Sequence, residues 1–178
     1  MIEMTLKNLI VGGGPIPSAI ILAPASADEG ETGDAETSDM ALPINVGSVD
    51  AANVARAVES EEAKRPTTHM LLGDTVAALG ATLESISITR VEGATFYATL
   101  DITSATGETH HIDARPSDAI ALAITADRPM FATREVLDCA GTPDFDAIAR
   151  EERTREEAEF HDFVEGLSPD DFKAPKQG

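Results

Sequence analysis

The stretch of sequence that decides the fold is residues 110–124, which read HHIDARPSDAIALAI. Residues 108–113 are predicted to form a strand. This strand ends shortly before Pro116, because proline suits the first position of the helix that follows. Asp118 then lies in the first turn, where the positive end of a helix favours an acidic side chain. Residues 119–124 are apolar on every side, as expected for a buried helix. The sequence therefore predicts a strand that passes directly into a buried helix over residues 116–125.

The polar residues of this stretch have two interpretations. Neighbouring side chains of a strand face opposite ways, so if Ile112 points into the core, His111 and Asp113 share the other face. In the structural interpretation these residues cap the helix, compensate its dipole or form an Arg115–Asp113 bond. In the functional interpretation the helix N-terminus is an anion site to which Arg115 adds a phosphate clamp. Asp113 and Asp118 would then hold hydrated Mg²⁺ or act as a base.

The functional interpretation depends on one expectation, namely that the guanidinium and carboxylates around Arg115 open onto water beside the positive end of the helix. His69 is a second candidate. It borders the apolar stripe of a helix predicted over residues 66–79, with Leu72, Val76 and Leu79 inward. A packed, hydrogen-bonded histidine is the structural explanation. The functional alternative is an anion site at this helix start, where Thr67 would bind the ligand.

Composition limits the choice of function. The 178 residues carry 13 basic and 32 acidic side chains, a net charge of −19, which repels nucleic acid. Cys139 is the single cysteine, so no intramolecular disulfide can form. The N-terminus does not resemble a signal peptide and no segment is long and apolar enough to span a membrane. We expect a cytoplasmic protein with no membrane partner.

The rest of the chain mixes strands and helices. Alternating or continuous apolar residues predict strands over 2–10, 19–22, 41–46, 83–90, 96–102 and 130–131, and helices over 48–58 and from Thr133 onward. In residues 83–90, Glu84, Ile86, Ile88 and Arg90 are predicted to share one face. Turns are expected at Gly93 and Gly107. This order of elements is typical of the α+β class.

Two segments differ from the rest. Residues 28–39 hold six acids and no base, which predicts a mobile acidic loop. Residues 141–178 predict a charged C-terminal helix and tail, because apolar residues recur there at helical spacing between runs of charge. We therefore expect one domain over residues 1–140, followed by this helix.

Four motifs in this order resemble the bifunctional nuclease domain family: residues 42–47 (LPINVG), 64–72 (KRPTTHMLL), 92–98 (EGATFYA) and 113–123 (DARPSDAIALA). The last motif is close to diagnostic. Met70 departs from the family pattern, since it replaces a usual Asp. That loss removes an acid that would orient His69 or help to bind metal.

The resemblance implies an α+β fold with a mixed, strongly bent sheet, a homodimer, and nuclease activity on DNA and RNA. It implies catalytic roles for His69, Asp113, Arg115 and Asp118, and binding roles for Thr67, Ser117 and Tyr97. Asp113 and Asp118 would hold Mg²⁺ or Mn²⁺. The alternative is a non-catalytic dimeric module that binds a small anionic ligand or a protein partner, which suits the acidic composition better than nucleic acid does.

Overall fold

The computed structural model describes residues 1–13, 17–25, 40–59 and 65–144. The predicted acidic loop over 28–39 and all but the first residues of the predicted C-terminal segment lie outside the described residues. Residues 1–143 form one compact unit and residues 144–178 a second one.

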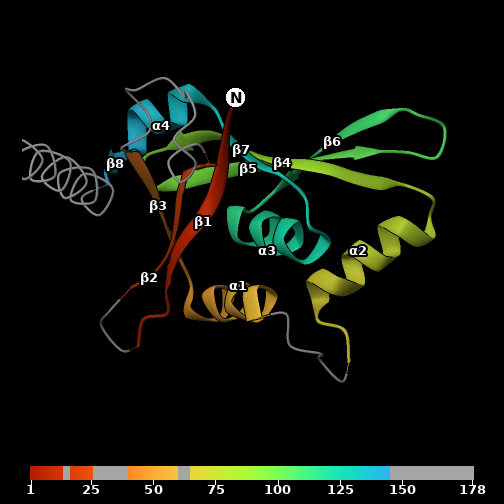
Figure 1. The fold of residues 1–178 in the computed structure, drawn as a ribbon, viewed down its shortest axis with the longest axis horizontal. Coiled ribbons are helices and arrows are strands. Elements are labelled where there is room, and N and C mark those ends of the chain that lie inside the picture. The colour runs from red at the N-terminus through yellow and green to blue at the C-terminus, as the bar shows by residue number, and fades with distance from the viewer. Residues whose placement is uncertain (14–16, 26–39, 60–64, 145–178) are drawn as a thin grey trace, which may run out of the picture. The chain divides into compact units, whose positions relative to one another are not determined.

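The described residues of the first unit form an eight-stranded sheet and four helices. Figure 1 shows how the helices lie beside the sheet. The strands are β1 (Ile2–Ile10), β2 (Ser18–Pro24), β3 (Met40–Val46), β4 (Thr82–Glu92), β5 (Thr95–Thr103), β6 (Thr109–Ala114), β7 (Met130–Ala132) and β8 (Thr142–Pro143). The helices are α1 (Ser48–Glu59), α2 (Thr68–Ala78), α3 (Pro116–Ala126) and α4 (Arg134–Ala140). The strand order is β6-β5-β4-β7-β1-β2-β3-β8. Among the described strands only β4 and β7 pair in parallel, which confirms the predicted α+β class with a mixed sheet.

Helix α3 is the central helix of the unit, as residues 110–124 predict. It packs against α1, α2, β4 and β5, and Figure 1 shows it between the sheet and α1. Its side chains from Ala119 to Ala123 are buried. The helix ends at Asp127, whose left-handed backbone (φ 50°) lets its N–H reach back to the last turn.

Two β-bulges bend strand β4 and change which of its side chains face the core. The pairing with β5 skips Glu84 and Thr89, so the alternation of faces is interrupted on both sides of the segment Ile86–Ile88. Ile86 and Ile88 are buried, whereas Glu84 is exposed. The prediction that Glu84 and Arg90 share the face of the two isoleucines is wrong, because the bulges shift the register.

Three apolar side chains predicted to face the core are exposed. Ile112 is 46% exposed because β6 is the edge strand of the sheet and has a neighbour on one side only. Leu72 is 42% exposed and Leu79 is more exposed still. Helix α2 buries His69 and half-buries Val76, so its contact face lies to one side of the predicted stripe.

The glycine turns are confirmed. Gly93 joins β4 to β5 with φ 60°, and Gly107 joins β5 to β6 with φ 83°. Both angles lie in the left-handed region that side chains other than glycine rarely adopt. Among the described residues no helix is long and apolar enough to cross a membrane.

Candidate functional site

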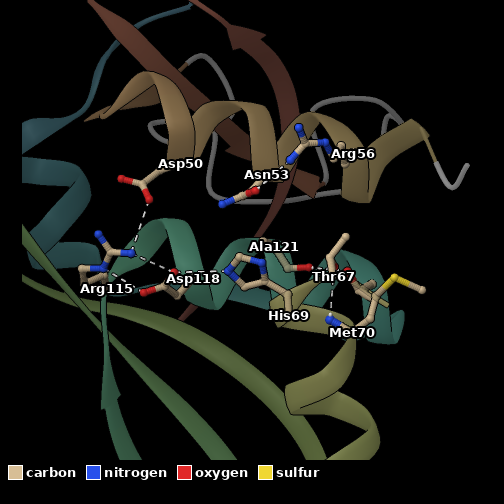
Figure 2. Close-up of polar contacts among 10 residues, drawn as sticks. Asp50, Asn53, Arg56, Thr67, His69, Met70, Arg115, Asp118 and Ala121 are labelled. Carbon is tan, nitrogen blue, oxygen red and sulfur yellow. Dashed lines mark hydrogen bonds and ion pairs between the residues drawn. The ribbon is translucent and has the colours of Figure 1, made fainter. Parts of the chain in front are cut away.

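The polar residues of three helices meet where α2 and α3 begin, beside the first turns of α1. Figure 2 shows Asp50 on α1 above Arg115 and Asp118 at the start of α3, with His69 of α2 next to Asp118. Pro116 occupies the first helical position of α3, as the sequence predicts. Each side chain thus lies in or beside the first turns of a helix, where it meets the other helices.

Arg115 and Asp118 form a two-pronged ion pair. Nε of Arg115 donates to Oδ2 of Asp118 at 2.8 Å, and Nη2 donates to Oδ1 at 3.0 Å. Nη2 also donates to Oδ1 of Asp50 at 3.3 Å, which ties α3 to α1 across 65 positions of sequence. The predicted Arg115–Asp113 bond is absent from the described residues, because Asp118 and Asp50 take the guanidinium instead.

His69 joins this pair through Asp118. Its Nε2 lies 3.2 Å from Oδ1 of Asp118, and the His69 side chain is 11% exposed. A carboxylate that accepts from an imidazole fixes its orientation and favours the proton on the bonded nitrogen. Nδ1 of His69 has no partner among the described residues. The carboxylate expected to be lost with Met70 is therefore supplied by Asp118, from another helix.

The ion pair fixes the charge of both partners. Burial acts to raise the pKa of Asp118, but the hydrogen bonds and charges of Arg115 and His69 outweigh it, so the pKa is lowered. The hydrogen bond and charge of Asp118, followed by the charge of Asp50, raise the pKa of Arg115. Near neutral pH the site holds a permanent cation against two acidic side chains.

The site opens to solvent on the side of Arg115. The Arg115 side chain is 64% exposed and the Asp118 side chain 38%, which confirms the expectation that these groups reach water. A groove of about 270 Å³ adjoins them; it is lined by residues 44–47, Asp50, residues 94–96 and residues 115–117. The groove joins the ends of β3 and the β4–β5 hairpin to the start of α3.

Comparison with known proteins agrees with the four sequence motifs. The bifunctional nuclease domain matches residues 33–144. The chain belongs to the bifunctional nuclease domain family. It is 36% identical over 140 residues to "Uncharacterized protein MT1877" of Mycobacterium tuberculosis (strain CDC 1551 / Oshkosh), a match that covers 76% of this chain and 83% of that protein. "Uncharacterized protein Rv1829" of Mycobacterium tuberculosis (strain ATCC 25618 / H37Rv) matches with the same identity and coverage.

The structure brings some of the predicted site residues of this bifunctional nuclease domain together and separates others. His69, Arg115 and Asp118 are in contact, and buried Ser117 lines the adjoining groove. Thr67 caps α2, where its Oγ1 accepts from the backbone N–H of Met70 at 3.4 Å.

Tyr97 and Asp113 are not part of this cluster. The Tyr97 hydroxyl donates to Oε2 of Glu92 at 3.3 Å, and the Arg90 guanidinium lies 3.9 Å from the centre of its ring. Tyr97 therefore belongs to a contact within the β4–β5 hairpin. Asp113 lies on β6 opposite Thr99, and its side chain is exposed without a hydrogen bond to any described residue.

The sequence-based reasoning did not include Asp50 among the site residues of this family member. Asp50 lies in the first turn of α1, where an acidic side chain compensates the helix dipole. No local sequence pattern predicts the hydrogen bond between Asp50 and Arg115, because this contact depends on how α1 packs against α3.

A divalent metal ion does not fit the cluster as the side chains lie. Mg²⁺ requires several oxygen ligands with free lone pairs. Both oxygens of Asp118 already accept hydrogen bonds, and Asp113 is not among the residues that contact it. Within the described parts of the chain no three His, Cys, Asp or Glu side chains are grouped closely enough to hold a metal.

Proposed function

We propose that this bifunctional nuclease domain hydrolyses phosphodiester bonds in RNA, DNA or both, at the cluster of His69, Asp118 and Arg115, next to the groove that Arg115 lines. The observation that carries the proposal is a continuous set of hydrogen bonds between side chains. It runs from the nearly buried imidazole of His69 through Asp118 to the exposed guanidinium of Arg115. Family membership supports the same chemistry. The three side chains supply the roles that hydrolysis of a phosphodiester needs.

Arg115 binds the phosphate oxygens and offsets the negative charge that grows on them in the transition state. Its remaining N–H groups are available because the side chain is mostly exposed. The backbone N–H and the hydroxyl of Ser117, which lines the groove, add donors beside it. Asp50 holds the guanidinium from the other side, so that the fork keeps one orientation.

His69 is the proposed acid–base group, and Asp118 orients it. With Nε2 held by Asp118, Nδ1 accepts a proton from the attacking oxygen or returns one to the leaving oxygen. RNA is the substrate on which such a site acts most readily. Its 2′-hydroxyl is an internal nucleophile already adjacent to the phosphorus: the hydroxyl proton passes to His69, the bond from phosphorus to the 5′-oxygen breaks, the leaving 5′-oxygen takes the proton back, and a 2′,3′-cyclic phosphate remains. DNA lacks this hydroxyl and requires an external water.

The charge of the chain sets a limit on this function. Residues 40–143 contain seven basic and fourteen acidic side chains, so no basic groove attracts a long duplex. The substrate is bound by few contacts around Arg115. We expect weak binding and slow cleavage.

Removal of the guanidinium is the direct test. Arg115→Ala is expected to lower the cleavage rate of labelled RNA and single-stranded DNA about 100-fold, the size of effect seen when a single transition-state donor is removed. The matched control is Arg128→Ala, which removes an exposed arginine just beyond the other end of α3 and should leave the rate unchanged. Equal cleavage by both variants and the unaltered protein would assign the activity to a contaminant and contradict the proposal.

Chelation separates this proposal from the expectation of a metal pair. We expect cleavage to persist in EDTA and in Asp113→Asn, because Asp113 has no contact with the cluster. If cleavage instead requires Mg²⁺ or Mn²⁺ and disappears in Asp113→Asn, then Asp113 and Asp118 share a metal as the resemblance implies. The Asp113→Asn rate, measured with and without metal, distinguishes the two mechanisms.

A second candidate is a non-catalytic dimeric module that binds a small anionic ligand or a protein partner. It is favoured by the acidic composition, and by a groove in which Arg115 is the one basic side chain, which suits a small ligand better than a nucleic acid that needs a row of cations. Its signature is an increase in melting temperature with inorganic phosphate or a nucleoside monophosphate, absent in Arg115→Ala, in a protein that cleaves neither RNA nor DNA.

A further inference from the structure

The two edges of the sheet are protected very differently. Strand β8 closes one edge with two residues, Thr142–Pro143, and its proline has no N–H to offer. Strand β6 forms the other edge with six residues, Thr109–Ala114, of which all but the last are exposed. Figure 1 shows β6 at the border of the sheet formed by the described strands.

Natural proteins usually protect a long edge strand with lysine, proline or a bulge, because its unpaired N–H and C=O groups invite another strand. The segment THHIDA of β6 contains no lysine, arginine or proline. Its pairing with β5 runs without a bulge from Thr109 to Ala114. The edge therefore presents a regular, unprotected template.

A second copy of the chain can pair with this edge only in certain registers. Two identical antiparallel strands that continue one sheet are related by a two-fold axis perpendicular to it, so the residue on the axis faces its own symmetry mate. With Asp113 on the axis two carboxylates would oppose each other, and like charges in directly opposed positions are unfavourable. With His111 on the axis Asp113 would lie opposite Thr109, so no imidazole would meet a carboxylate.

Ile112 on the axis gives the complementary register. Two isoleucines then meet, and His111 of each copy lies opposite Asp113 of the other. The ring of His111 is already oriented for this contact, since its Nδ1 is 2.6 Å from Oδ1 of Asp101. Asp101 is itself held by the hydroxyl of Ser85, which donates to Oδ2 at 2.9 Å. The Nε2 of His111 has no partner among the described residues.

We propose that β6 pairs antiparallel with β6 of a second copy, with Ile112 on the two-fold axis and His111 bonded to the partner's Asp113. This goes beyond the proposed function and names the surface that a homodimer of this chain would use. Because the axis is perpendicular to the sheet, the candidate sites of the two copies lie on the same face of the joined sheet.

Strand pairing over six residues is a small contact compared with a standard interface of about 1,600 Å². The dimer is therefore weak and depends on concentration. We expect sedimentation equilibrium to show monomer and dimer in exchange, with a dissociation constant roughly in the micromolar range.

Substitution at the axis tests the surface. Ile112→Lys places two ammonium groups against each other and is expected to leave only monomer over the whole concentration range. Ile112→Val keeps the apolar contact and a β-branched side chain, so it should dimerise as the unaltered protein does. Circular dichroism melts check that both variants fold, which the partial exposure of Ile112 favours. A dimer that survives Ile112→Lys, or an unaltered protein that is monomeric throughout, overturns the proposal.

Cross-linking tests the register. Cys139 is exposed and is first replaced by serine. Ile112→Cys in this background should form a disulfide between copies on mild oxidation, because directly opposed residues lie within disulfide reach. Thr109→Cys is the control: three positions from the axis, the two sulfurs would be about 20 Å apart. No disulfide from Cys at position 112, or an equal yield from position 109, contradicts the register.

Discussion

Replacement of Asp118 by alanine is expected to lower the rate of RNA cleavage at least about 100-fold and to destabilise the fold by roughly 1–3 kcal/mol. Asp118 is the link between the two other members of the site. Without it His69 loses its orienting carboxylate, and Arg115 keeps only its longer bond to Asp50. Both losses act at once, because one carboxylate carries both contacts.

The control for this prediction is Asp74→Ala, which removes an exposed aspartate of α2 without a partner among the described residues. It should change neither the cleavage rate nor the urea midpoint measurably. If Asp118→Ala retains full cleavage while its stability falls, the carboxylate acts only as a structural clamp and the assignment of His69 as acid–base group is contradicted.

The pH dependence of stability has a defined sign. The pKa of Asp118 is lower in the folded chain than in the unfolded one, so folding favours its ionised form. Its contribution is fully present above the unfolded pKa of about 4 and is lost as the pH falls through the lowered folded pKa. The difference in urea midpoint between the unaltered protein and Asp118→Asn should therefore be constant near neutrality and shrink below about pH 4.

The second large effect is expected in the core. Leu122→Ala should reduce the free energy of unfolding by about 3 kcal/mol, because it removes most of a side chain that is 1% exposed on the central helix α3. The same substitution at Leu72, which is 42% exposed on α2, should cost less than about 1 kcal/mol. Urea unfolding of both variants at neutral pH measures the difference.

The comparison of these two leucines also discriminates between two arrangements of α2. The sequence pattern of α2 predicts that Leu72 faces the core. If Leu72→Ala were as destabilising as Leu122→Ala, that pattern would be right and the packing of α2 described above would be wrong.

Local sequence patterns were sufficient for most elements of this fold. Alternation of apolar residues located β1 and β5, the glycines marked the hairpin turns, and the proline before the apolar run of α3 fixed the start of that helix. These features depend on neighbours within about one turn or one strand, so the sequence carries them directly. The four sequence motifs likewise indicated the family before the structure was known.

The errors have a common cause, which is that the environment of an element is set by residues far away in sequence. Ile112 is an apolar residue of the kind found in protein cores, but β6 lies at an edge, and among the described strands only β5 pairs with it. Glu84 was misplaced because a bulge is a property of two paired strands. Leu72 was misplaced because the contacts of α2 with α3 and β4 select another face of the helix.

The sequence by itself determined the α+β class, the strand-to-helix passage at Pro116, the family, and His69, Arg115 and Asp118 as candidate residues. Only the tertiary structure decided that these three side chains form one connected group, and that Asp50 joins them while Asp113 and Tyr97 do not. The physical reason is that hydrogen bonds and ion pairs between helices depend on packing, and the partners here are 49 and 65 positions apart.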